Sequence, residues 1–254
     1  MLMPIDYLQR YRNIKVKAGK EDEETQSSRL VVYQVKIGKY FMMDWDADSE
    51  ERKDFNTVTR GSRRNEWYRE NKPKILNAAM GKGAPEDYEL ALEWAVRAGR
   101  ISHASKGTIQ AFADDHLGID CSGFVTNYLI AAGKMMHTDR TVRNTNAASY
   151  FSPQKAVNDA SAIRPGDLLV WMRGNQVKRR PGHIAVVQSY VPASRLGGNM
   201  QVVEATGSRN ASPKLLDSMY KVEHIHRAGV GRSTMILEVK RHGRSGSRVS
   251  VMRY

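Results

Sequence analysis

A succession of short apolar segments, rich in Val, Leu and Ile, dominates the C-terminal part of the sequence. Turn residues and polar loops separate these segments, and each has the length and composition of a strand. The last two, which flank HGRSG, predict a closing hairpin. Strands that follow one another after a helix predict an α+β layer and exclude alternating parallel strand-helix units. The segments are RPGDLLVWM (164–172), HIAVVQSYV (183–191), QVVEA (201–205), TMILEVKR (234–241) and SRVSVMRY (247–254).

Two helices are predicted before these strands. In GIDCSGFV (118–125), Asp120 is placed to cap a helix whose apolar residues share one face and whose end is Gly133. The segment EDYELALEWAVRAG (86–99) has apolar residues near helical spacing and ends at Gly99, a common helix stop. We expect this segment to be the first helix of the main domain.

The composition sets further limits. A chain of 254 residues that is 41% apolar can bury a substantial core, and its single cysteine excludes an intramolecular disulfide. The first residues contain no apolar segment of the signal-peptide type, and no run approaches the roughly 20 apolar residues of a membrane span. We therefore expect a soluble chain, made in the cytoplasm and lacking a general secretory signal. The net charge of +13 favours nucleic acid, anionic lipid or an anionic wall polymer as partner.

Residues 1–85 differ in pattern from the rest. A charge-mixed stretch at 17–29 precedes LVVYQVKIGKYFMMDW (30–45), which predicts one long strand or a hairpin, and a second polar stretch follows. The glycines and proline of GKGAP (81–85) interrupt regular structure. We predict an accessory region at 1–85, which serves delivery, partner binding or substrate access, and a main domain at 86–254.

The lone cysteine, Cys121, lies in the first turn of a predicted helix. It could simply fill the core, but the N–H groups and helix dipole at this position stabilise a thiolate and an oxyanion, and Gly123 leaves the turn open to a substrate carbonyl. A cysteine nucleophile needs a base, and His183, at the start of a strand, is the best-placed histidine. A hairpin that pairs His183 with Glu204 brings the carboxylate to the imidazole. Spacing alone leaves Glu204 equally open to being a solvated charge on an edge strand.

The other histidines occupy polar or irregular contexts, where a solvated side chain is expected. His224 and His226 share a strand face, but no further Cys or His completes a ligand set, so we expect no metal and no other cofactor. The histidines concerned are His103, His116, His137, His224, His226 and His242.

Four motifs in order, DCSGFV (120–125), RPGDLLVW (164–171), GHIAVV (182–187) and VVEATG (202–207), resemble those of the NlpC-type papain-like cell-wall peptidases. The resemblance spans about residues 88–210. It implies a papain-like α+β fold, with the N-terminal catalytic helix packed on an antiparallel sheet, for a catalytic domain at 86–254. It also implies hydrolysis of peptidoglycan stem peptides, commonly at the γ-D-glutamyl to diaminopimelate bond.

The same resemblance assigns residue roles. Cys121 is implied as nucleophile, His183 as base and Glu204 as the residue that orients the imidazole. In relatives that require a free L-alanyl amine, the residues flanking the cysteine help to bind it. The candidate substrate-binding residues are therefore Asp120 and Ser122, together with Gly123 and Gly182.

Glu204 departs from the family pattern, in which the third position is usually His, Asn or Gln. A glutamate there is similar to the related CHAP amidases, whose cysteine motif this chain does not share. A carboxylate orients and stabilises an imidazolium at least as well as an amide, so the chemistry is retained, while the bond that is cut stays open.

Three functions fit the sequence. The first is a peptidoglycan hydrolase, acting in the periplasm or cell wall as an antibacterial effector or phage lysis factor, with an immunity protein or secretion machinery as partner. The second is an acyltransferase, transglutaminase or deamidase acting on a protein or lipid, because the acyl-enzyme chemistry is shared. The third is a non-catalytic module that binds wall or nucleic acid, although the aromatic interleaving of a single-strand binder is missing. Its basic residues would include Arg60, Arg63, Arg64, Lys178, Arg179 and Arg180.

Overall fold

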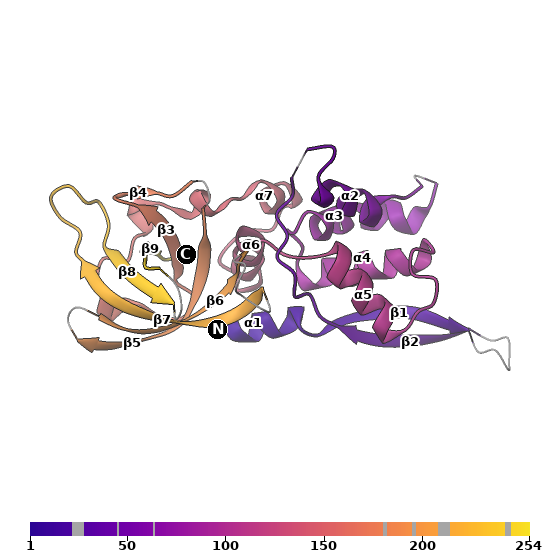
Figure 1. Cartoon of the computed structure of the whole chain (residues 1–254), viewed down its shortest axis with the longest axis horizontal. Helices are drawn as coiled ribbons and strands as arrows, with labels where there is room; N and C mark the ends of the chain where they lie inside the picture. The colour runs from indigo at the N-terminus through magenta and orange to yellow at the C-terminus, as the bar shows by residue number, and fades with distance from the viewer. Residues whose placement is uncertain are drawn as a thin grey trace.

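Strand β3 is paired on both edges, and this closes the main sheet into a barrel (Figure 1). The sheet is antiparallel, in the order β4-β3-β5-β6-β7-β8-β9, and β3 also pairs with β9 through Leu168 and Met252. The strands are β3 (Leu168–Arg173), β4 (Gln176–Val177), β5 (Ile184–Ser194), β6 (Gly197–Ala205), β7 (Leu215–His226), β8 (Ile236–Arg241) and β9 (Ser247–Met252). The computed structural model describes residues 1–21, 28–44, 46–62, 64–179, 182–194, 197–207, 214–241 and 245–254.

The expected papain-like arrangement, a helix packed on an antiparallel sheet, is therefore wrong. In the described part of the chain, six antiparallel strands form a closed barrel instead. The predicted strand segments and the closing hairpin of β8 and β9 are confirmed. Their closure was not predicted, because it depends on the pairing of β9 with β3, which lies far from it in the sequence, and closure leaves these strands without a free edge.

Both faces of the barrel wall are buried at β3, whereas β7 alternates buried and exposed residues. Along β3, Leu168 and Val170 face one hydrophobic cluster, whereas Leu169 and Trp171 face another. The second cluster draws residues from β3, β5, β6, β7, β8 and β9 and forms the barrel interior. A strand with two buried faces is apolar at every position instead of at alternate ones, which explains the uninterrupted apolar run of this segment.

The predicted helices are present. Helix α6 (Cys121–Ala131) begins after Asp120, whose side chain accepts the Gly123 N–H, and Gly133 follows its end with a positive φ of 69°. Helix α4 (Pro85–Arg97) precedes Gly99, whose φ is 68°. Helix α6 packs against β5 and β6, on the side of the barrel that faces the helical half of the molecule (Figure 1).

Residues 1–85 contain more regular structure than their polar sequence indicated. They form α1 (Pro4–Tyr11), β1 (Ile14–Glu21), β2 (Ser28–Val35), α2 (Glu50–Thr59) and α3 (Glu66–Ala79). The strand predicted at 30–45 ends at Val35, because residues 39–41 turn to pair with Ile119 instead. Trp45, at the end of that prediction, lies outside the described residues. The other helices are α5 (Lys106–His116), α7 (Asp139–Asn144) and the 3-10 turns η1 (Ala147–Tyr150), η2 (Pro153–Lys155) and η3 (Ala160–Ala162).

One hydrophobic core joins the N-terminal region to the nucleophile helix. Tyr7 and Tyr11 of α1 are buried, and their rings lie 5.8 Å from that of Phe124 in α6. Tyr7 also lies 5.9 Å from the ring of Tyr128. The position of α6 therefore depends on contacts from the N-terminal helix.

Candidate active site

Cys121 is the first residue of α6 and lines a cavity of about 260 Å³. Its side chain is buried at the bottom of this cavity, with only 6% of the residue exposed. Asp120 caps the helix, so the first turn is fixed and the unpaired N–H groups of the helix start lie beside the sulfur. This is the position that the sequence predicted for the thiol.

His183 lies between Cys121 and Glu204. Its Nε2 is 2.7 Å from Oε2 of Glu204, and its side chain is also hydrogen-bonded to that of Cys121. With Nε2 held by the carboxylate, Nδ1 is the ring nitrogen left for the sulfur. The edge of the Trp171 ring packs against the imidazole, with 4.4 Å between ring centroids. The structure thus brings together the three residues that the motifs singled out.

His183 and Glu204 each stabilise the charged form of the other. Burial alone lowers the pKa of His183, but the hydrogen bonds to Cys121 and Glu204 outweigh it and raise the pKa to about 9. Burial alone raises the pKa of Glu204, but the bonded His183, Ser218 and Arg241 lower it to about 2. These shifts favour an imidazolium at His183 and a carboxylate at Glu204 at neutral pH.

The remaining oxygen of Glu204 is held by side chains from β7, the strand paired with β6, and from β8, the next strand in the sheet. Its Oε1 accepts hydrogen bonds from Ser218 (2.8 Å) and Tyr220 (3.1 Å) on β7, and from Arg241 on β8 (2.7 Å). Glu204 is only 1% exposed, which excludes the solvated edge-strand position that the sequence left open. Sequence reasoning missed these three partners because β7 was not predicted, although Ser218 and Tyr220 have the two-residue spacing of one strand face.

Tyr40, from the region predicted to be accessory, also reaches the nucleophile. Its hydroxyl lies 4.0 Å from Sγ of Cys121 and accepts a hydrogen bond from the Cys121 backbone N–H. Burial, followed by the nearby Cys121 and Asp120, raises the pKa of Tyr40 well above its usual range. The hydroxyl therefore keeps its proton at working pH and is available as a donor beside the sulfur.

The four predicted substrate-binding residues, Asp120, Ser122, Gly123 and Gly182, do not share one environment. Asp120 and Ser122 both contact Lys82, with the Lys82 Nζ 2.6 Å from Oδ2 of Asp120. Gly123 faces the Gly81–Lys82 backbone, where a Cβ would overlap the Gly81 carbonyl oxygen. Gly182 lines the cavity. Lys82 was missed because it lies in GKGAP, a segment that the sequence marked only as a boundary.

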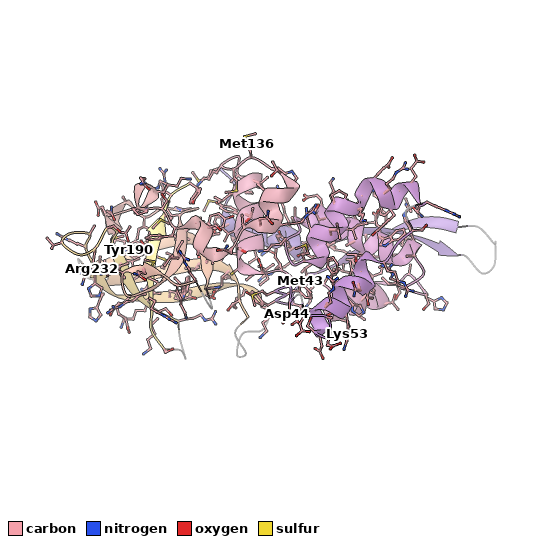
Figure 2. The ribbon with its side chains drawn as sticks, turned by 90° about the horizontal axis from the view of Figure 1, so that it is seen from above. Met43, Asp44, Lys53, Met136, Tyr190 and Arg232 are labelled. Atoms are coloured by element: carbon pink, nitrogen blue, oxygen red, sulfur yellow. The ribbon has the colours of Figure 1, made fainter. Side chains whose placement is uncertain are left out.

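The cavity beside Cys121 has a basic and methionine-rich wall. Its lining includes Tyr40, Lys82, Asp120, Arg143, Arg179 and Gly182, together with Met42, Met43 and Met80. A larger cavity of about 560 Å³ includes Tyr190, Asn158 and Arg227 in its lining, and its described lining residues include no thiol or imidazole. In Figure 2, Met43 lies where the barrel meets the helical half, whereas Tyr190 lies towards the far end of the barrel. The group of Cys121 and His183 therefore places the candidate active site in the smaller cavity.

The other candidate residues lie elsewhere. His116 contacts Asp54 at 2.8 Å, and His226 contacts Glu238 at 3.0 Å. Among the described residues, no group of three His, Cys, Asp or Glu side chains could hold a metal ion. Arg60 and Arg64 lie between α2 and α3, whereas Lys178 and Arg179 follow β4. Arg63, Arg180 and His242 fall outside the described residues.

No protein-family model, curated protein or solved structure matches this chain. Within the described residues, no helix combines the length and the apolar character needed to cross a membrane.

Proposed function

We propose that the protein is a cysteine peptidase or amidase that hydrolyses peptidoglycan stem peptides. The observation that carries this proposal is the position of His183, which is bonded to Cys121 on one side and to the buried Glu204 on the other. A nucleophile, a base and a group that orients the base are the minimum for covalent catalysis by a thiol. The motif order, which resembles that of NlpC-type peptidases, supports a wall peptide as substrate.

The first half-reaction forms a thioester. The Cys121 thiolate attacks the carbonyl carbon of the scissile amide, and the carbonyl oxygen becomes an oxyanion. We assign the Cys121 N–H and the Tyr40 hydroxyl, which are hydrogen-bonded to each other beside the sulfur, as the donors that would turn to this oxyanion. His183 then gives its Nδ1 proton to the leaving nitrogen as the C–N bond breaks, and the amine product departs.

The second half-reaction releases the acyl product. Neutral His183 removes a proton from a water molecule, whose oxygen attacks the thioester carbon. The C–S bond breaks, the carboxylic acid product departs, and the thiolate and imidazolium are restored. Throughout the cycle, Glu204 holds Nε2 and stabilises the imidazolium, and Arg241, Ser218 and Tyr220 hold Glu204.

The place of action belongs to the same proposal. A wall substrate requires delivery to the periplasm or cell wall, where an antibacterial effector or a phage lysis factor would act. An effector of this kind would be paired with an immunity protein. The net charge of +13 supports binding to an anionic wall.

Mass spectrometry of purified muropeptides after incubation with the protein tests the proposal. We expect cleavage within the stem, with the γ-D-glutamyl to diaminopimelate bond as the favoured site, and no product with Cys121→Ala. If the stems stay intact although the protein has another activity that alkylation of Cys121 abolishes, the peptidase proposal is overturned. That result would favour the acyltransferase, transglutaminase or deamidase alternative. Wall binding without any thiol-dependent reaction would favour the non-catalytic module.

A further inference from the structure

The buried ammonium group of Lys82 pairs with the carboxylate of Asp120, the residue that precedes Cys121. Lys82 and Asp120 form an ion pair with 2.6 Å between Nζ and Oδ2, and their side chains are only 10% and 9% exposed. Nζ also donates to the Ser122 hydroxyl and, at 2.9 Å, to the carbonyl oxygen of Thr145. An ammonium has three donors, so all three are used within the protein.

Both oxygens of the Asp120 carboxylate have partners within the protein. Oδ2 holds Lys82, while Oδ1 accepts the Gly123 N–H and, at 3.1 Å, the Ser122 hydroxyl. A substrate ammonium that approached Asp120 would meet a carboxylate that is already neutralised. It would also have to come close to the Lys82 ammonium, whose like charge would repel it.

The charge balance of the cavity points the same way. Among its described lining residues, the cations Lys82, Arg143 and Arg179 outnumber the one carboxylate, Asp120. Asp120 is paired within the protein, so the charge that the cavity presents to a ligand is positive. Guanidinium groups bind carboxylates with good geometry.

We propose that Lys82 is a specificity-determining residue. By pairing with Asp120, Lys82 makes the site select stem peptides that have no free amino group and that carry a carboxylate beside the scissile bond. This inference rests on the proposed function and names its substrate class as the blocked stem, still attached through its alanyl nitrogen. Lys82 is a positioning residue for Asp120 and Ser122, since it takes no part in the transfer of protons.

Two substrates that differ by a single charge test the inference. They are a free tetrapeptide stem and the same stem acetylated on its alanyl amine, each assayed for kcat/KM at pH 6.5. We expect the wild type to cleave the acetylated stem at least tenfold faster. Lys82→Met frees the Asp120 carboxylate and should reduce this ratio tenfold or invert it. Lys106→Met, which removes an exposed cation at the start of α5, should leave the ratio unchanged.

The ratio of kcat/KM on the two stems separates a change in selectivity from a general loss of activity, because a disordered site loses activity on both stems alike. Equal rates on both stems, or a preference of the wild type for the free amine, would overturn the role of Lys82 and leave the proposed function standing. An unchanged ratio in folded Lys82→Met would do the same. Cleavage of neither stem would overturn the proposed function and this inference with it.

A second measurement needs only the wild type, in case Lys82→Met does not fold. The alanyl amine loses its charge near pH 8, so raising the pH from 6.5 to 9 should bring the rate on the free stem towards that on the acetylated stem. Titration of the enzyme affects both stems equally and cancels in the ratio. The titratable and charged groups around the cavity are Tyr40, Lys82, Asp120, Cys121, Arg143, Arg179 and His183. A ratio that does not change with pH would contradict the exclusion of the amine.

Discussion

His183 Nε2 lies 2.7 Å from Glu204 Oε2, although the two residues are not opposite each other in the sheet. The predicted hairpin register, which paired Ala185 with Val202, is wrong: the structure pairs Val187 with Val202. A shift of two residues keeps the same side chains on the same face, so His183 and Glu204 become diagonal neighbours and their long side chains still meet.

Cys121→Ala should fold normally and release no product from muropeptides, because no thioester can form without the sulfur. Circular dichroism checks the fold, and mass spectrometry checks the products. Iodoacetamide should abolish the activity of the wild type, since this is the chain's single cysteine. Turnover by the alanine variant would show that another group is the nucleophile.

Activity should fall as the pH rises through about 9, because deprotonation of His183 removes the proton needed by the leaving amine. Glu204→Gln removes the negative charge that helps to raise this pKa, while the amide oxygen can still accept from Nε2–H. We therefore expect the alkaline limb of kcat/KM to move to lower pH and kcat to fall about 10- to 100-fold. Glu238→Gln is the matched control, since Glu238 also contacts a histidine and an arginine but lies on the surface around His226. An alkaline limb that is identical in both variants would contradict the pairing.

Arg241→Met leaves the buried Glu204 without its arginine partner and should lower the free energy of unfolding by about 3 kcal/mol. Arg248→Met, which breaks an ion pair of a half-exposed arginine on the neighbouring strand, should lower it by less than about 1 kcal/mol. Urea denaturation of the two variants measures the difference. Equal losses would mean that Arg241 is not needed to hold Glu204.

Tyr40→Phe should lower kcat about 10- to 100-fold with little change in KM, because it removes a donor that faces the oxyanion but leaves the ring in place. Tyr33→Phe is the control: its hydroxyl donates to the Ala104 carbonyl at 2.8 Å, away from Cys121. Steady-state kinetics on a defined stem peptide separates the two. An unchanged kcat in Tyr40→Phe would restrict the residue to packing.

Deletion of residues 1–80 should abolish activity. The sequence pattern predicted an accessory role for residues 1–85, but Tyr7 and Tyr11 pack on Phe124, and Tyr40 lies at the sulfur. The fragment should therefore expose the apolar face of α6 and lack an oxyanion donor. Size-exclusion chromatography and the stem-peptide assay check these outcomes. A soluble, active fragment would show that the catalytic part folds without α1.

Local patterns located much of the site because each depends on neighbouring residues. The cap at Asp120 and the stop at Gly133 define α6, and the apolar runs define β3, β5 and β6. The partners of Glu204 could not be found in this way, since β7, which carries Ser218 and Tyr220, was not predicted, and Arg241 lies on β8, two strands from β6.

The sequence by itself determined the capped helix that begins with Cys121, the strand that follows His183 and the strand that carries Glu204. The tertiary structure alone decided that the strands close into a barrel, that the Tyr40 hydroxyl lies beside the sulfur of Cys121 and that Lys82 pairs with Asp120. Caps and strand patterns are local and leave a signature within a few residues. Barrel closure and the pairing of buried charges join residues far apart in the chain, where no local pattern records which partner is chosen.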